Sequence, residues 1–467
     1  MLLLAAKSFA ADPRIDSWFT EDSGRYARIY RTTADESAGI SVTTWSRGQG
    51  TQSLPVYAGV REIYSSGSWV YIRSSGLASY VMGPWYLNTA KTQLFPSYPA
   101  NSRVLYRIPR NPAVPGTKTL TGLGAIGYFV NGVALFDGRD AFYWNGTSEV
   151  MGNGLWNRDA FVNEAVTFDA ALAHQAGANH HYHANPIALR HQLGDHVDYD
   201  AASNRYAEAA GAPTKHSPIV AWVRDGFPIY GPYGYSNPTN PAGGIRRMIS
   251  GFVLRDGQNG TTNLPATGRT TLPRWAGRAY NRSTTLAAGE YGPAISAQYP
   301  LGRYIEDNDY LGDLGRVQGV DFDLDEYNGR FCRTPEFPEG TYAYFVAITA
   351  SGVPVFPYNV GRSFYGTPAG GAVTSLAETV TTNFVGGASA ELRLSPAVWG
   401  NDIVTLVWSA TEGGTYRVES SPDASGWTTN ATGITAVRNQ GGYTAAARAT
   451  NELFRVTRTA LAPFDTN

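Results

Sequence analysis

The sequence predicts a mainly β protein, in which a β-rich domain with short helices and long loops precedes a small C-terminal immunoglobulin-like β-sandwich. Short runs of β-branched and aromatic residues, each closed by a turn dipeptide, recur along the chain, whereas helical periodicity is scarce. The 467 residues include 52 Gly and 27 Pro, and 13% of them are aromatic. A chain of this length and composition can bury one large core or two ordinary ones.

The N-terminal residues support two predictions. Residues 1–10, MLLLAAKSFA, are apolar and end in Ser8-Phe9-Ala10, a small-x-small pattern like the end of a truncated signal peptide. The alternative is an ordinary N-terminus, because the apolar stretch is short and lacks a basic start. Together with the low charge content, the pattern favours a secreted, periplasmic or cell-surface protein. Residues 11–119 are predicted to form a β-rich part packed on the core.

Residues 120–366 are predicted to form the central domain. Within it, residues 127–136 have the pattern of a hairpin that turns at Asn131-Gly132. Short helices are predicted at 184–193 and 274–278. Further Asn-Gly turns are predicted at 145–146, 259–260 and 328–329.

The composition changes near the C-terminal end of this domain. The stretch Gly366-Thr-Pro-Ala-Gly-Gly371 is typical of a linker, which we place at 367–374. Residues 375–467 contain neither His nor Cys and are predicted to form the β-sandwich. Its clearest strands are expected at 402–409, 415–420, 443–447 and 453–457.

Composition also excludes several classes of function. Thirty-seven basic residues against 38 acidic ones give a net charge of −1, which does not fit a nucleic-acid-binding protein. No apolar run approaches the ~18 residues of a membrane span, so an integral membrane protein is not expected. The motif Gly122-x-Gly-x-x-Gly127 is rejected as a dinucleotide site, because a strand and a turn follow it instead of a helix.

The histidines are the strongest chemical signal in the sequence. All seven lie between positions 174 and 216, and a His-rich tract of this kind indicates metal binding. If residues 179–184 are extended, His181 and His183 lie on one face with their Cβ atoms about 7 Å apart, close enough to share a metal ion. Tyr182 and His180 then point to the other side.

Further ligands must come from tertiary folding. We expect His181, His183 and His216 to bind the metal, with His174 the least certain ligand because flexible Ala176-Gly177-Ala178 separates it from the predicted strand. His180 is a further candidate. Imidazole suits copper, zinc, iron and nickel alike. We favour copper, with zinc as the alternative, because several imidazoles near tyrosines in an oxidising compartment suit redox chemistry.

Several motifs in this part of the chain resemble the YHYH-domain family of secreted bacterial and algal proteins. The resemblance covers roughly residues 120–366 and implies a secreted domain centred on its histidines. The motifs are His180-His-Tyr-His-Ala-Asn-Pro186, Gln192-Leu-Gly-Asp195, His216-Ser-Pro218, Asp225-Gly-Phe-Pro-Ile-Tyr230, Leu324-Asp-Glu-Tyr-Asn-Gly-Arg-Phe-Cys332 and Thr334-Pro-Glu-Phe-Pro-Glu-Gly-Thr-Tyr342.

The chain departs from this family in two ways. His180 stands where the first Tyr of the motif is expected. Many members also repeat the motif after a Pro-Glu-Phe-Pro-x-Gly segment, where this chain has Tyr342-Ala-Tyr-Phe345. The resemblance therefore implies an internal repeat whose second copy lacks histidines. Cys332, the only cysteine, is expected to be either a buried inert thiol or a thiolate ligand.

An acidic stretch gives a separate prediction. Asp321, Asp323 and Asp325, followed by Asn328-Gly329, resemble the start of a calcium loop, although Glu326 stands where an EF-hand needs Gly. A solvated acidic loop is the alternative. A third interpretation brings these acids to the histidine site.

Three functions remain open. The first is a secreted metalloenzyme in which Tyr182 lines the site and Asp225 orients an imidazole or acts as a base. The second is a non-catalytic cell-surface or assembly protein whose loops are held by a transition metal or calcium. The third is a glycan-binding module that uses its many tyrosines and tryptophans. The substrate is unknown, and a polysaccharide or cell-surface polymer is the partner we consider.

Overall fold

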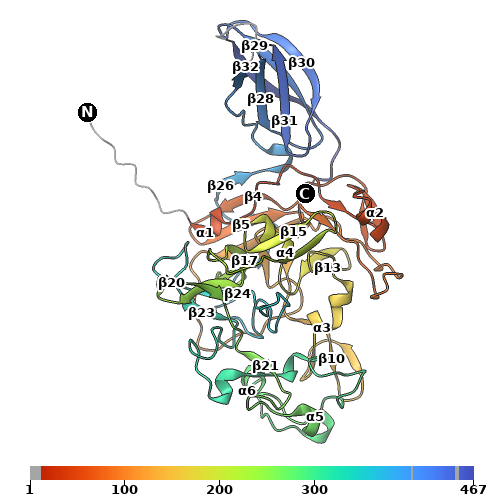
Figure 1. Ribbon diagram of the computed structural model, residues 1–467, viewed down its shortest axis with the longest axis vertical. Helices are drawn as coiled ribbons and strands as arrows, with labels where there is room; N and C mark the ends of the chain where they lie inside the picture. The colour runs from red at the N-terminus through yellow and green to blue at the C-terminus, as the bar shows by residue number, and fades with distance from the viewer. Residues whose placement is uncertain (1–11, 401–402, 447–451, 467) are drawn as a thin grey trace, which may run out of the picture.

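The computed structural model describes residues 12–400, 403–446 and 452–466. The predicted signal peptide at 1–10 lies outside these residues. The predicted fold class is confirmed, because the chain is mainly β, with short helices and many small sheets (Figure 1). None of the helices in the described residues is long and apolar enough to cross a membrane.

An eight-stranded sheet forms the centre of the molecule. The predicted hairpin turning at Asn131-Gly132 is present as β8 and β9. In spatial order the strands are β13 (Ala173–Ala176), β14 (Asn179–Tyr182), β9 (Ala134–Leu135), β8 (Gly127–Phe129), β17 (Ile219–Val223), β18 (Pro228–Tyr230), β24 (Thr341–Phe345) and β23 (Gly329–Cys332).

The strand order of this sheet is symmetric about its middle. On one side of the antiparallel β8–β17 pair, hairpin β8–β9 continues into β14, parallel to β9, and then into β13. On the other side, hairpin β17–β18 continues into β24, parallel to β18, and then into β23. The internal repeat implied by the resemblance is therefore confirmed by topology.

The register matches the two halves residue by residue. Tyr182 pairs with Leu135 in the first half, and Tyr344 pairs with Ile229, the residue at the same place in the second. By the same register, Ala343 corresponds to His181 and Arg330 to His174. The second half therefore keeps the framework of the first, but it lacks the first half's histidines.

A five-stranded sheet from the N-terminal part packs beside the central sheet. Its order is β25 (Gly371–Ala372), β7 (Val104–Pro109), β5 (Trp69–Ser74), β4 (Val60–Ser65) and β26 (Thr381–Val385). Residues 367–374, for which a linker is expected, thus contain an edge strand that pairs with β7. β26 pairs with β4, although sequence alone assigns it to the sandwich. One continuous hydrophobic core, from Trp18 to Phe364, joins both sheets.

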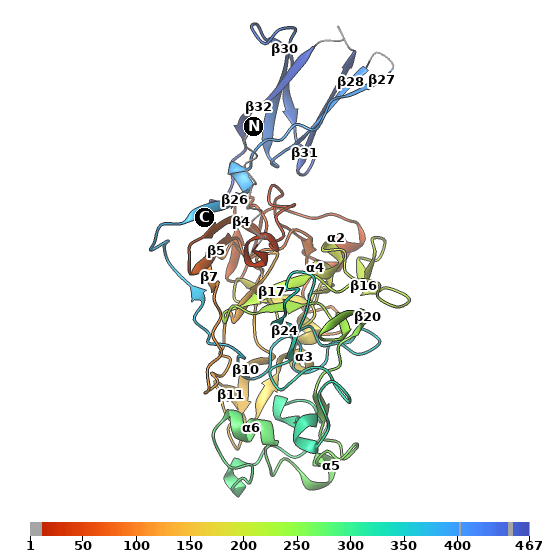
Figure 2. The ribbon, with the colours of Figure 1, turned by 90° about the vertical axis from the view of Figure 1, so that its left-hand side faces the viewer.

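The lower part of the molecule in Figures 1 and 2 is rich in loops and has its own core. Trp156, Phe252, Trp275, Tyr304 and Phe356 fill this second core. Its helices and strands include β10 (Arg139–Trp144), β11 (Glu149–Met151), β12 (Asn157–Asp159), α5 (Leu264–Thr267), α6 (Arg274–Ala279), β21 (Phe252–Leu254) and β22 (Asn308–Tyr310).

The remaining helices and small strands are short. The α-helices are α1 (Pro13–Asp16), α2 (Thr33–Ser37), α3 (Ala160–Glu164) and α4 (Ile187–Gln192), and the last, like α6, falls where a helix is predicted. The 3-10 turns include η1 (Ala165–Thr167). The paired strands are β1 (Arg28–Ile29) with β6 (Val81–Met82), β2 (Trp45–Arg47) with β3 (Gly50–Gln52), β15 (Val197–Asp200) with β16 (Arg205–Glu208), and β19 (Tyr233–Asn237) with β20 (Asn240–Arg247).

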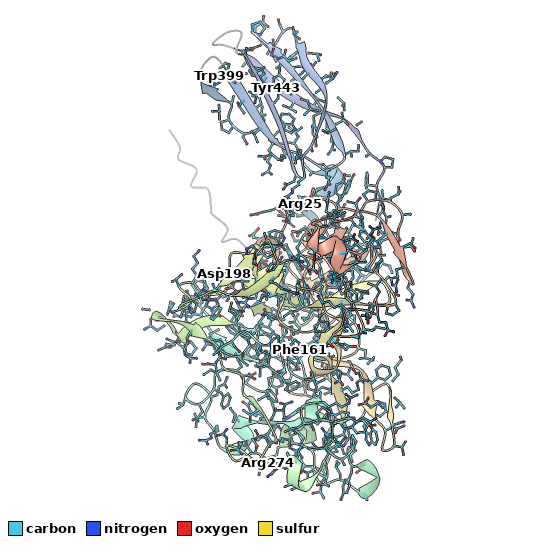
Figure 3. The ribbon with its side chains drawn as sticks, turned by 45° about the vertical axis from the view of Figure 1, so that its right-hand side comes forward. Arg25, Phe161, Asp198, Arg274, Trp399 and Tyr443 are labelled. Atoms are coloured by element: carbon cyan, nitrogen blue, oxygen red, sulfur yellow. The ribbon has the colours of Figure 1, made fainter. Side chains whose placement is uncertain are left out.

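The C-terminal part is a two-layer β-sandwich that stands apart from the rest of the molecule (Figure 2). Side chains of both layers meet in its core. Figure 3 labels two residues of this part of the chain, Trp399 and Tyr443. One layer contains β27 (Val398–Gly400), β28 (Ile403–Ser409) and β31 (Gln440–Ala446), and the other β30 (Thr428–Thr435), β29 (Gly414–Ser421) and β32 (Leu453–Leu461). Immunoglobulin-like topology stays a prediction.

Polar contacts connect the sandwich to the N-terminal part. The Glu412 carboxylate accepts hydrogen bonds from the backbone N–H of Tyr26, at 2.8 Å, and from the Arg28 guanidinium. Asp465, beyond the last strand, accepts from Gln52 at 2.9 Å. These contacts lie far from the histidines in the sequence, and none involves a histidine.

Candidate metal centre

The β13–β14 hairpin places two histidines directly opposite each other. His174 and His181 are paired in its register, and Gly177 turns the chain between the strands with a φ of 61°. Opposed residues in an antiparallel pair have Cβ atoms about 5 Å apart. The flexible Ala176-Gly177-Ala178 segment therefore joins His174 to His181, although the sequence suggested that it would separate them.

His183 lies just beyond the end of β14 and turns back toward the same point. Its Nε2 atom is 3.0 Å from Nε2 of His181. Ligand atoms of His174, His181 and His183 all lie within 4.8 Å of one another, and all three residues are buried. We call these three residues the His triad.

Hydrogen bonds fix the tautomer of two triad histidines. The Nδ1–H of His181 donates to the backbone carbonyl of Asn179 at 3.0 Å, and the Nδ1–H of His183 donates to that of Asp137 at 2.7 Å. A carbonyl oxygen only accepts, so each Nδ1 must carry the proton. In both neutral rings, Nε2 therefore carries no proton and presents a lone pair.

The third histidine is fixed through a hydroxyl group. Thr167 Oγ1 donates to the Glu164 backbone carbonyl at 2.7 Å, which uses its single proton. The same oxygen lies 2.7 Å from Nδ1 of His174 and must accept from it. Nε2 of His174 is consequently a lone pair as well, and this buried atom has no hydrogen-bond partner.

This arrangement fits a metal ion. Two lone pairs at 3.0 Å repel each other unless a cation lies between or beside them. Two nitrogens that bind one zinc or copper ion at about 2.0–2.1 Å lie about 2.9–3.4 Å apart. Histidines that bind a metal usually donate the N–H of the other ring nitrogen to an acceptor, as all three rings do here.

Glu164 adds a carboxylate to the site. Its Oε2 lies 3.3 Å from Nε2 of His183 and 3.7 Å from Nε2 of His174. Burial raises the pKa of Glu164 to about 7, although 28% of its side-chain surface remains exposed to the pocket described below. Glu164 is not predicted from the sequence, because one glutamate in a short helix carries no local signal.

Burial keeps the triad neutral. It lowers the pKa of His174 and His181 well below the usual value, and the neighbouring imidazoles lower it further. The pKa of His183 is also lowered by burial. Phe136 stacks on His181 with ring centroids 3.9 Å apart, and Phe168 packs edge-on to His174. Neutral imidazole is the form that binds metal.

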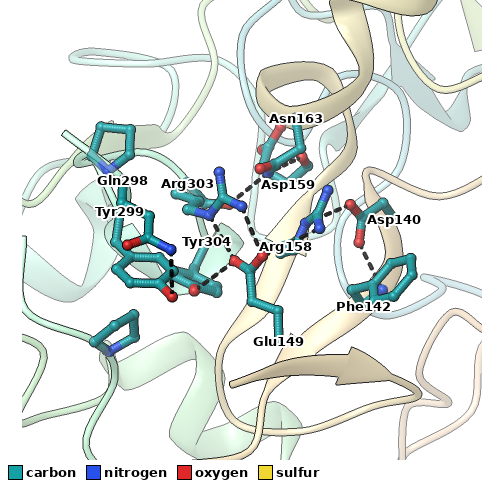
Figure 4. A network of polar contacts seen from close by, with 12 residues as sticks. Asp140, Phe142, Glu149, Arg158, Asp159, Asn163, Gln298, Tyr299, Arg303 and Tyr304 are labelled. Atoms are coloured by element: carbon teal, nitrogen blue, oxygen red, sulfur yellow. Dashed lines mark hydrogen bonds and ion pairs between the residues drawn. The ribbon is translucent and has the colours of Figure 1, made fainter. Parts of the chain in front are cut away.

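A network of charged groups anchors the helix that carries Glu164. Asp159 caps α3 by accepting from the backbone N–H of Val162, and Asn163 donates to the Arg303 carbonyl (Figure 4). Arg158 pairs with Asp140 at 2.8 Å and also with Glu149. Because these groups are partly or fully buried, they hold α3 in a defined position beside the triad.

The triad opens into a pocket of about 680 Å³. Glu164 and Asp140 are among its lining residues, together with both apolar and other polar side chains. The lining residues outside the triad include Gln49, Leu87, Phe95, Leu123, Phe136 and Gln175. A metal ion on the triad would therefore face a space large enough for a small molecule.

Comparison with known proteins agrees with the resemblance. The model of the YHYH protein family matches residues 105–356, more than half of the chain. The chain belongs to the YHYH protein family. No curated protein and no solved structure matches it. Every residue of the triad lies within the matched YHYH domain, whereas part of the pocket wall, including Leu87 and Phe95, comes from outside it.

The two other histidines expected as ligands, His216 and His180, lie apart from the triad. His216 packs against Tyr230, Tyr235 and Phe345, in the second half of the sheet, and its Nδ1 donates to the Ser217 carbonyl. His174 thus replaces His216 in the three-nitrogen site expected from the sequence. His180 points to the other side of β14, as predicted, and packs on Trp85.

Tyr182 and Asp225 do not face the triad either. The Tyr182 hydroxyl lies 2.6 Å from that of Tyr80, on the face of β14 opposite the triad. Asp225 sits in the β17–β18 turn and accepts from the Tyr344 hydroxyl at 2.6 Å and from the Gly366 N–H. The structure therefore brings neither side chain to the triad, and both make hydrogen bonds within the YHYH domain or to residues beside it.

The acidic residues considered for calcium do not converge. Asp323 forms a bidentate pair with Arg246, and Asp321 accepts from the backbone N–H of Val317. Asp325 accepts from the N–H groups of Tyr327 and Gly329. Asp169 makes the same two turn contacts in the first half of the sheet, which explains Asp325 without a metal.

Cys332 is buried in β23, and burial raises the pKa of its thiol. It does not belong to the group of ligand atoms around the triad. This position fits the inert thiol of the two alternatives raised by the sequence.

Proposed function

We propose that this protein binds one transition-metal ion through Nε2 of His174, His181 and His183. The observation that carries the proposal is the convergence of three imidazole lone pairs, each fixed by an acceptor on its Nδ1. None of the three Nε2 atoms carries a proton that it could donate to another. A bound cation would remove their repulsion.

We propose copper as the metal, with zinc as the alternative. Imidazole nitrogens bind both, and for a given set of nitrogen and oxygen ligands divalent copper binds most tightly among the first-row metals. The tyrosines that first suggested copper do not support this choice, because Tyr182 faces away from the triad.

The proposed metal centre is open on one side. Structural sites are usually closed by four protein ligands, whereas catalytic sites leave a position for water or substrate. Three nitrogens and an adjoining pocket favour the second kind, so we propose a metal-dependent enzyme. When bound, the metal would supply Lewis-acid or redox chemistry. Glu164, with its raised pKa, would accept or return a proton within the pocket.

A secreted or cell-surface location completes the proposal. It is supported by the apolar residues 1–10 with their small-x-small ending and by the low content of charged residues. The contrasting function is a non-catalytic surface protein in which the metal only holds loops together. Solvent access to the bound metal distinguishes the two functions.

The experiment is a metal titration of the full chain and of matched variants. Purified protein is stripped with chelator and titrated with Cu²⁺ and Zn²⁺ in a calorimeter, and elemental analysis gives the stoichiometry. We expect one ion per chain in the wild type and none in the His181→Ala/His183→Ala variant. His180→Ala and His216→Ala serve as controls, because both residues are buried histidines outside the triad.

The outcomes separate the alternatives. Unchanged affinity in the His181→Ala/His183→Ala variant would contradict the proposed site. Loss of binding in His216→Ala but not in His174→Ala would restore the ligand set expected from sequence. For the copper form, electron paramagnetic resonance should show nitrogen couplings and an exchangeable water, and a shell without water would favour the non-catalytic function.

A further inference from the structure

Two chemically different groups of side chains line the pocket beside the His triad. One group is the triad with Glu164. The other, which we call the apolar end, is Leu87, Phe95 and Leu123: the two leucines are 39% and 49% exposed, and the Phe95 ring lies 6.0 Å from that of His174. Exposed apolar side chains gathered around one pocket mark a binding surface.

The charged groups of the pocket are already paired, apart from Glu164. Arg139 is the one cation among the described lining residues, and Asp137 binds it at 2.9 Å. Asp140 is paired with Arg158 at 2.8 Å. A ligand that carried a charge on the part facing Leu87 and Leu123 would therefore lose part of its hydration without gaining an ion-pair partner.

The apolar end is held firmly in place. The Trp85 indole N–H donates to the Ala173 carbonyl at 3.0 Å, and the Gln175 side chain donates to the Ser97 carbonyl. The backbone N–H of Ala100 donates to the Ala178 carbonyl. Segment 85–100 is thus fastened to the β13–β14 hairpin that carries two of the triad histidines.

We propose that the pocket selects a small molecule with one lone-pair donor group and an uncharged apolar body. The donor group faces the triad, and the apolar body packs against Leu87, Phe95 and Leu123. This proposal rests on the proposed function for the donor end. Leu87 and Phe95 lie outside residues 105–356, so the specificity of this chain comes partly from its own N-terminal part.

The test compares three probes on the zinc-loaded full chain by calorimetry. Imidazole supplies the donor group alone, 4-phenylimidazole adds an apolar ring, and 4-(4-carboxyphenyl)imidazole adds a charge to that ring. We expect 4-phenylimidazole to bind about tenfold or more tightly than imidazole, because the ring is buried against apolar side chains. We expect the charged probe to lose this gain.

Substitutions at the pocket mouth give the second measurement. In Leu123→Asp and Leu87→Asp, the advantage of 4-phenylimidazole should fall below about threefold, while imidazole affinity stays unchanged. Both side chains are exposed, so the fold should tolerate the change. Val320→Asp is the matched control, since Val320 is 81% exposed and is not a lining residue.

The results separate this inference from the proposed function. Equal affinities for imidazole and 4-phenylimidazole, or tight binding of the charged probe, would overturn the inference. If the protein binds no zinc, the same probes are titrated into the metal-free chain. A ring-dependent gain that Leu123→Asp abolishes would then support the pocket inference while the metal proposal fails, and no gain would overturn both.

Discussion

Asn131 and Asp225 occupy the same position in two hairpins of the central sheet. Asn131 Oδ1 accepts from the backbone N–H of Val133, and Asp225 Oδ1 accepts from that of Phe227, two residues further on in each case. Each side chain also contacts a tyrosine hydroxyl, that of Tyr182 or Tyr344. The repeat therefore explains Asp225 as part of the framework.

This relationship predicts the effect of changing Asp225. Asp225→Ala leaves the Tyr344 hydroxyl and two backbone N–H groups buried without their acceptor, which should lower the free energy of unfolding by about 2–4 kcal/mol. Metal affinity should stay unchanged. Asp225→Asn keeps part of these contacts and should cost less. Urea unfolding measures the stability, and metal titration measures the affinity. An Asp225→Ala protein that keeps full stability but binds no metal would show that Asp225 contributes to the metal site.

Thr167 should tune metal affinity without touching the metal. Thr167→Val removes the acceptor of the His174 Nδ1–H, so the ring can adopt the wrong tautomer or turn. We expect the dissociation constant for the metal to rise about 10–100-fold, as when other groups that hydrogen-bond a metal-binding histidine are replaced. Thr167→Ser keeps the hydroxyl and is the control. Equal affinities of the Val and Ser variants would show that His174 is not held in this way.

Metal affinity should depend on pH in two steps. The pKa of Glu164 is raised to about 7, so below this pH the metal-free protein holds a proton that metal binding must displace. Affinity should be constant above pH 7 and fall by at most about tenfold per pH unit below it. The triad begins to compete for protons only at lower pH, because burial has lowered the pKa of its histidines.

The variant Glu164→Gln separates these two steps. It has no titrating carboxyl, so its affinity should stay constant through pH 7 and fall only when the triad takes up protons. Calorimetry in buffers of different ionisation enthalpy counts the protons released. A slope that persists between pH 7 and 6 in this variant would assign the proton to another group.

The sandwich should be dispensable for metal binding. A chain ending at Ser389 keeps β25 and β26 and loses only the sandwich, so we expect it to bind one metal ion with a somewhat lower melting temperature, because Arg28 and Tyr26 lose Glu412. A chain ending at Gly366 also loses β25 and β26, which exposes the edges of β7 and β4. This shorter chain should aggregate more. Loss of metal from the longer of the two would show that the sandwich supports the site.

The sequence by itself determined the class of fold and the region of the site. Turn dipeptides and alternating residues predicted the β8–β9 hairpin and the sandwich strands, because these patterns depend on residues close together in the chain. The confinement of all histidines to positions 174–216 predicted metal binding there. The spacing of His181 and His183 placed both on one face of an extended segment.

Tertiary structure decided which residues complete the site. The turn at Gly177 brings His174 opposite His181, a signal present in the sequence as a short small-residue segment between two histidines. Glu164, Thr167 and the Asp137 carbonyl come from other segments, so no local pattern announces them. His216 and Asp225 belong to the second half of the sheet. Strand pairing within each half, and not distance along the chain, determines which side chains come into contact.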